Sequence, residues 1–257
     1  MFCNQISNSK RNTWRECKLK YKYNYVDRIK ETDKGNKSAL QFGSYIHEIF
    51  ELGVEAISIG ELERIAKELK GKYSFDASYN PKVKTCLKNF LRLNSSLSEV
   101  GHAELRLTED LGCVKHLSII DRVVKGKNGG ILVLDYKTGK REKSKFDLFK
   151  CTQGRSYTYA VHKELGVPLN KITFAHYYPL TDNLVTVSYS PADIADNNRK
   201  IVEDAWKIKK AKVEDLIPSE NQYCNWCGYK SVCPIFNPKE LVEERLLNAE
   251  KKPKRSS

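Results

Sequence analysis

The chain has 257 residues, with 45 Lys and Arg against 32 Asp and Glu, which leaves a formal net charge of +13. This length can bury a sizeable core, and the positive charge favours a polyanionic partner such as nucleic acid or an anionic membrane surface. The polar N-terminus lacks the apolar region of a signal peptide, and no run approaches 18 apolar residues, so a soluble cytoplasmic protein is expected rather than a secreted or membrane-spanning one.

The first third of the chain is predicted to be mostly helical. Apolar residues recur at helical spacing from Ala39 to Ile57 and place His47 beside the buried face of that helix. A second helix is predicted over 61–70. A third begins after Asn80, where Pro81 suits the first helical position.

Alternating apolar residues then predict strands. They lie over 103–107, 116–124 and 131–136, with a glycine-rich turn at 125–130, and again over 172–178 and 184–189. A helix carrying Phe149 to Val161 separates the two groups, and Ser190 with Pro191 begins a last long helix through Lys212. The pattern predicts an α/β (α+β) fold, in which a central mixed β-sheet is flanked by helices.

The hairpin formed by 116–124 and 131–136 carries the chemistry. With its turn centred on Asn128, Asp121 lies opposite Asp135, and both side chains leave the same face, as does Lys137 two residues further on. Paired carboxylates suit Mg2+ or Mn2+, and a neighbouring ammonium can orient a water or neutralise developing charge. The arrangement predicts phosphodiester hydrolysis, with a surface salt bridge as the simpler interpretation of Asp-x-Lys.

A cysteine cluster stands near the C-terminus. Cys224, Cys227 and Cys233-Pro234 follow the spacing C-x2-C-x5-C-P, and Cys17 is available as a fourth ligand from about 200 residues earlier. Eight cysteines in a reducing cytosol argue against disulfides. The spacing therefore predicts an iron–sulfur or metal site, with structural zinc as the alternative.

Several motifs together resemble the PD-(D/E)XK nuclease superfamily, in particular its RecB-like branch with an iron–sulfur cluster, which includes AddB nuclease domains and CRISPR-associated RecB-like exonucleases. The outer cysteines match that branch. In chain order, the other matching segments are Gly43-x3-His47, Ile120-Asp121-Arg122, Asp135-Tyr136-Lys137-Thr138-Gly139 and Gln153-x3-Tyr157.

The resemblance implies a restriction-endonuclease-like core and a role for each matched residue. His47, Asp121 and Asp135 would bind the catalytic Mg2+ or Mn2+, helped by the backbone carbonyl of Tyr136, and Lys137 would be the catalytic lysine. Glu104 matches the first acidic motif, near the metal, while Gln153 and Tyr157 would face the DNA. The implied [4Fe-4S] cluster, held by Cys17, Cys224, Cys227 and Cys233, would join the N- and C-terminal segments.

Each assignment has a simpler alternative. His47 and Tyr157 could be core residues, and Glu104 could face solvent. The basic and aromatic run Lys18–Tyr25 could track a phosphate backbone, or its tyrosines could pack on the cysteine cluster.

We therefore expect residues 1–240 to form one nuclease domain, followed over 241–257 by a helix end and a basic disordered tail. The expected function is a metal-dependent DNA nuclease, more an exonuclease than an endonuclease, acting on single strands or duplex ends in recombination, repair or phage DNA metabolism. The sequence has no nucleotide-binding G-x4-G-K-[ST] loop, so any helicase that drives it is a separate protein. The alternatives are a non-catalytic DNA-binding subunit of a repair or CRISPR-adaptation complex and a zinc-stapled RNA-binding module; a prokaryotic cell or phage-infected host fits such a chain.

Overall fold

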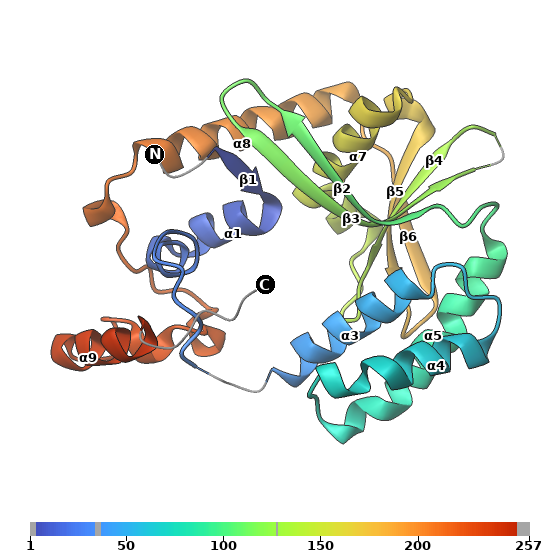
Figure 1. Cartoon of the computed structure of the whole chain (residues 1–257). Helices are drawn as coiled ribbons and strands as arrows, with labels where there is room; N and C mark the ends of the chain where they lie inside the picture. Colours follow the sequence, from blue (N-terminus) through green and yellow to red (C-terminus); the bar gives the residue numbers. More distant parts are fainter. Residues whose placement is uncertain (1–3, 34–36, 127, 251–257) are drawn as a thin grey trace. The chain divides into compact units, whose positions relative to one another are not determined.

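The computed structural model describes residues 4–33, 37–126 and 128–250 (Figure 1). They belong to two compact units. The first takes the described residues within 1–36, 112–115 and 201–257, and the second takes those within 37–111 and 116–200. The predicted tail over 251–257 lies outside the described residues. That residues 1–240 fold as one domain stays a prediction.

The centre of the second unit is formed by five strands of a mixed sheet. It contains β2 (His102–Asp110), β3 (Lys115–Lys125), β4 (Ile131–Tyr136), β5 (Ile172–Tyr178) and β6 (Asn183–Val187). Strand β2 pairs with β3, β3 and β4 are antiparallel, β4 and β5 are parallel, and β5 and β6 are antiparallel. The predicted mixed sheet flanked by helices is confirmed.

Helices cover both faces of this sheet because successive strand residues alternate between two apolar cores (Figure 1). On one face, α3 (Ser38–Leu52), α4 (Ile59–Leu69) and α5 (Asn80–Ser96) pack against Leu134 and Tyr136 of β4. On the other, α6 (Lys145–Phe149) and α7 (Thr152–Leu165) pack against Val133 of β4 and Phe174 of β5. The end of β4 is thereby held between two helical layers.

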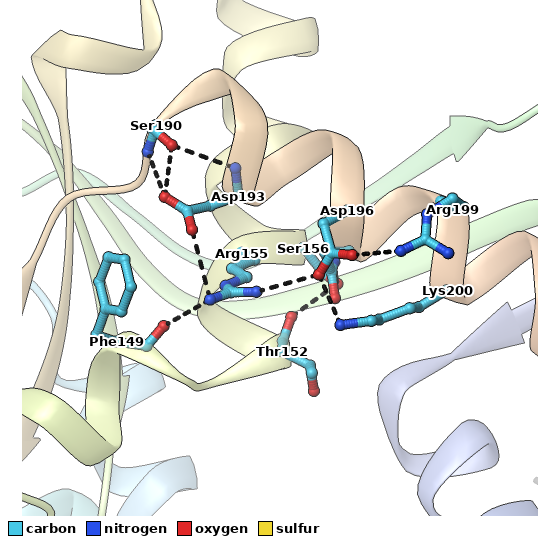
Figure 2. A network of polar contacts seen from close by, with 10 residues as sticks. Phe149, Thr152, Arg155, Ser156, Ser190, Asp193, Asp196, Arg199 and Lys200 are labelled. Carbon is cyan, nitrogen blue, oxygen red and sulfur yellow. Dashed lines mark hydrogen bonds and ion pairs between the residues drawn. The ribbon is translucent and has the colours of Figure 1, made fainter.

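A polar network joins α7 to the start of α8 (Pro191–Lys210), as Figure 2 shows. The guanidinium of Arg155 lies 3.6 Å from Asp193 and 3.7 Å from Asp196, and donates to the carbonyl of Phe149 at 3.3 Å. Ser190 caps the helix, since its hydroxyl accepts the Asp193 N–H at 3.2 Å and its own N–H donates to the Asp193 carboxylate at 3.0 Å. This capping box lowers the pKa of Asp193 through its bonds to Ser190.

The first unit begins with β1 (Gln5–Ser7), a strand that the sequence did not predict, followed by α1 (Asn8–Glu16), α2 (Lys18–Tyr21) and a π-helical turn at Lys22–Val26. Its C-terminal helix is α9 (Lys239–Glu250). Arg11 is buried and donates to Asp204 at 2.9 Å.

The basic run of this unit turns its aromatic rings inward. Tyr21 is 1% exposed and lies edge-on to Trp14, while Tyr23 is 5% exposed and lies against Tyr229. These two rings are core residues and not an open surface for base stacking. In the described part of the chain, no helix has both the length and the apolar character needed to cross a membrane.

Candidate active site

The site begins with α3, which carries His47 toward the end of β4. One turn before His47, Gly43 approaches the chain after β4 so closely that a β-carbon there would lie 3.1 Å from Thr138 Oγ1. Glycine therefore allows the helix and the strand end to come together. His47 Nδ1 then lies 3.4 Å from Asp121 Oδ1. Burial opposes the charged ring, yet the hydrogen bond and charge of Asp121 raise the pKa of His47 above its usual value.

Asp121 is fixed by the backbone of the neighbouring strand. The N–H of Tyr136 donates to Asp121 Oδ2 at 2.6 Å, so one carboxylate oxygen is held by β4 while the other faces His47. The Asp121 side chain is 13% exposed. The Tyr136 ring also lies edge-on to His47, with centroids 5.9 Å apart.

Asp135 and Lys137 form an ion pair at the end of β4. Asp135 is buried, and this burial raises its pKa above the usual aspartate value although the ammonium of Lys137 opposes the shift. Burial in turn disfavours the ammonium of Lys137, but Asp135 outweighs it and raises the pKa of Lys137. Both residues leave the same side of the strand, as the sequence predicted.

Glu104 lines the same cavity, of about 640 Å³, as His47 and Lys137. Its backbone has a φ of +46°, a left-handed conformation that is uncommon for a residue with a side chain and that clusters at functional sites. Burial and the nearby carboxylates of Asp121 and Glu51 raise the pKa of Glu104. His47, Glu104, Tyr136 and Lys137 thus line one cavity, while Asp121 contacts His47 and Asp135 contacts Lys137.

Three further residues that line this cavity, Glu48, Lys72 and Tyr73, were missed from the sequence. Glu48 follows His47 on α3. Its carboxylate accepts hydrogen bonds from Lys72 Nζ, at 2.6 and 2.7 Å, and from the Tyr73 hydroxyl. Lys72 and Tyr73 come from the segment after α4, and no motif or spacing near them signals a site.

Gln153 and Tyr157 meet on α7, as their i, i+4 spacing predicts. Gln153 Nε2 donates to the Tyr157 hydroxyl at 2.7 Å. The Tyr157 ring is 6% exposed and packs edge-on to Phe174, so it belongs to the core, whereas Gln153 is half-buried. Their contact with DNA stays a prediction.

His176 is a further residue that no sequence motif identifies. Its Nε2 lies 3.3 Å from Asp135 Oδ2. Burial lowers the pKa of His176 to about 3, so the ring is neutral near pH 7. The sequence holds no local signal for this contact, because it depends on the parallel pairing of β4 with β5.

The donor chemistry of this site fits a hard divalent cation, since Asp121 and Asp135 supply carboxylate oxygens and His47 a ring nitrogen. Within the described residues, however, no three His, Cys, Asp or Glu side chains are already grouped so that they could hold a metal ion. In this structure the carboxylate of Asp135 is turned to Lys137 and His176 instead.

The four predicted cysteine ligands also converge, within the first unit. These four residues line one small cavity of about 30 Å³, and all of them are free thiols: Cys17, Cys224, Cys227 and Cys233. Asn221 closes one side, because its N–H points to Cys224 Sγ at 3.3 Å and its amide donates to the Glu16 carbonyl at 3.1 Å. Four thiols around one cavity are a donor set that suits an iron–sulfur cluster or zinc, but among the described residues they are not grouped closely enough to hold a metal ion as they stand.

Comparison with known proteins agrees with this geometry. The model of the PD-(D/E)XK nuclease superfamily matches residues 5–234, and the chain belongs to that superfamily. Among solved structures, the chain resembles a "putative exonuclease" from Eubacterium rectale, with a TM-score of 0.57, 16% identity and 87% of each chain covered. It also matches the protein SSO0001, with a TM-score of 0.43, 15% identity, and 91% of this chain and 87% of that chain covered. No curated protein matches the sequence. At these identities, the first structure supports the fold alone.

Proposed function

We propose that the protein is a metal-dependent DNA nuclease that acts as an exonuclease on single strands or duplex ends. The observation that carries this proposal is a cavity lined by His47 and Lys137, each in contact with an aspartate, in a chain of the PD-(D/E)XK nuclease superfamily. Asp121 lies beside His47, and Asp135 forms an ion pair with Lys137. The exonuclease part of the proposal follows the printed name of the Eubacterium rectale structure, "putative exonuclease", with which the chain shares the fold.

In this proposal, His47, Asp121, Asp135 and the carbonyl of Tyr136 hold Mg2+ or Mn2+. When bound, the cation polarises the phosphoryl oxygen and lowers the pKa of the attacking water. Lys137 is protonated and lies at the same cavity, so it can orient that water and offset the negative charge that develops on the phosphate. Glu104 adds a carboxyl group near His47 and Asp121 and so supports the metal ligands electrostatically.

DNA would approach the cavity over α7, where Gln153 is the more accessible member of the Gln153–Tyr157 pair. Tyr157 then acts by holding the Gln153 amide in place. The site belongs to a cytoplasmic protein of DNA recombination, repair, phage DNA metabolism or CRISPR adaptation, and a separate helicase supplies any unwinding.

We further propose that Cys17, Cys224, Cys227 and Cys233 hold a [4Fe-4S] cluster, as in the RecB-like branch, with zinc as the alternative. The cavity that all four thiols line supports this assignment. A cluster there would cross-link α1 and α2 to the loop before α9 and so stabilise the first unit.

Linear and circular substrates distinguish an exonuclease from an endonuclease. The protein, purified without oxygen, is incubated with Mg2+ or Mn2+ and with matched linear and covalently closed single-stranded DNA. An exonuclease degrades the linear strand and spares the circle. Cleavage of the circle at a similar rate would contradict the exonuclease assignment, and stability of both substrates under either metal would contradict the nuclease itself.

A further inference from the structure

His176 of β5 and Asp135 of β4 are neighbours on adjacent strands of the second unit's sheet. They are directly paired in the parallel register of β4 and β5, so their side chains leave the same face. Both are buried, with exposed fractions of 1% and 2%, and His176 Nε2 lies 3.3 Å from Asp135 Oδ2. A buried carboxylate needs such a partner, because water does not reach it.

The other ring nitrogen of His176 has its own contact. Nδ1 lies 3.3 Å from the hydroxyl of Tyr178, and that hydroxyl accepts the backbone N–H of Lys143 at 2.8 Å. The hydroxyl has one proton, which it can donate to Nδ1, and a neutral imidazole carries one donor and one acceptor nitrogen. The proton of His176 is then on Nε2, the ring nitrogen that lies 3.3 Å from Asp135 Oδ2. Phe174 and Tyr178 hold the ring edge-on at centroid distances of 5.3 and 6.0 Å.

We propose that His176 is a positioning residue for the reaction: its Nε2–H holds Oδ2 of Asp135 and leaves Oδ1 for the metal, while Tyr178 and the Lys143 N–H set the tautomer. This inference rests on the proposed function of Asp135 as a metal ligand. Both Lys137 and His176 contact Oδ2. When Lys137 turns to the substrate, His176 keeps that buried oxygen paired, so the lysine can move without leaving Asp135 unsatisfied.

Two substitutions of His176 separate positioning from packing. His176→Gln keeps an N–H donor at the end of the side chain, and His176→Leu fills the core without a donor. Tyr178→Phe removes the proton that Nδ1 accepts and is the milder change. Tyr177→Phe is the matched control, because the Tyr177 hydroxyl donates to Asp182 at 2.8 Å from the other face of the same strand.

Calorimetric titration of the metal-free proteins with Mn2+ gives the first readout, and thermal unfolding gives the second. We expect His176→Leu and Tyr178→Phe to weaken Mn2+ binding by about tenfold or more, the usual effect of losing a residue that supports a metal ligand. His176→Gln should stay within about threefold of wild type. Tyr177→Phe should lower the melting temperature and leave Mn2+ affinity unchanged.

Equal Mn2+ affinity in wild type, His176→Leu and Tyr178→Phe would overturn the inference, as would an equal loss in the Tyr177→Phe control. Nitrogen-15 spectra of the His176 ring in metal-free protein test it without any metal or nuclease activity. A proton on Nε2 that shifts toward Nδ1 in Tyr178→Phe supports the inference, and a proton on Nδ1 in wild type overturns it. If wild type has the expected tautomer but neither binds Mn2+ nor cuts DNA, the proposed metal-dependent nuclease function is wrong. The positioning role of His176 is then wrong as well.

Discussion

Gly43 and Thr138 approach one another so closely that a β-carbon on Gly43 would lie 3.1 Å from Thr138 Oγ1. Gly43 stands one turn before His47 on α3, and Thr138 directly follows Lys137. The contact therefore sets the distance between the helix that carries the histidine and the strand end that carries the lysine. It gives a physical reason for a glycine in one motif and a small hydroxyl residue in the other.

Gly43→Ala should move α3 away from β4 by a few tenths of an ångström. We expect a cleavage rate reduced by about three- to tenfold, because catalytic groups tolerate little displacement. The melting temperature should change by only a few degrees. Thr138→Ala removes the atom that the new methyl group meets, so the double variant should regain most of the rate. Additive losses in the double variant would show that this contact does not position the site.

Gly154 allows α7 to lie directly on the sheet. A β-carbon there would lie 2.4 Å from a Phe174 ring carbon and 2.5 Å from the Tyr189 hydroxyl. Gly154→Ala should therefore lower the free energy of unfolding by about 1–3 kcal/mol. Gly60 in α4 is the matched control, since its β-carbon meets nothing within 4 Å, and Gly60→Ala should stabilise by about 0.5–1 kcal/mol. Chemical denaturation measures both, and equal effects of the two substitutions would refute the close packing of α7.

The Ser190–Asp193 capping box makes part of the stability depend on pH. Because its bonds to Ser190 lower the pKa of Asp193 below the unfolded value of about 4, this contribution is complete above that value. It is lost as the pH falls through the lower pKa of the folded state. Wild type should exceed Asp193→Asn in unfolding free energy by about 0.5 kcal/mol or more at pH 7, and the difference should shrink toward pH 3. In a Ser190→Ala background the difference and its pH dependence should both decrease; a constant difference would contradict the account.

The cysteine cavity predicts a bound group that can be measured directly. Protein purified without oxygen should be brown and contain about four iron atoms per chain. Cys227→Ser should lose the iron and melt at a lower temperature, whereas Cys151→Ser, outside the cavity, should keep the iron. One zinc per chain in colourless protein would show that the four cysteines bind zinc and not an iron–sulfur cluster. Absence of both iron and zinc would refute the proposed metal site.

The hairpin could be predicted from the sequence because local features fix its register. Its glycine-rich turn and alternating strands predicted pairing that is symmetric about Asn128, and the observed partner of Arg122 is Leu134, as that symmetry requires. One step further, where Asp121 would face Asp135, the Asp121 carboxylate instead accepts the N–H of Tyr136. The Asp121 side chain thus takes the place of a backbone acceptor for Tyr136, just beyond the last paired residues of β3 and β4. Residue spacing alone does not predict such a substitution.

The contacts of His176, Lys72 and Tyr73 could not be predicted, since they depend on packing between segments far apart in the chain. His176 reaches Asp135 through the parallel β4–β5 pairing, and Lys72 reaches Glu48 because α3 and α4 lie side by side. Motifs identified the residues whose chemistry is distinctive. They did not identify the ordinary residues that hold them in place.

The most direct test of the central claim is cleavage of end-labelled single-stranded DNA in the presence of Mn2+. Wild type is compared with Lys137→Ala, Asp121→Ala and Lys140→Ala, the last being an exposed lysine on the same segment. We predict that wild type and Lys140→Ala degrade the strand at similar rates, and that the other two variants, folded by their melting curves, lose activity by a factor of about 100 or more. Undiminished cleavage by Lys137→Ala and Asp121→Ala would show that the active site lies elsewhere.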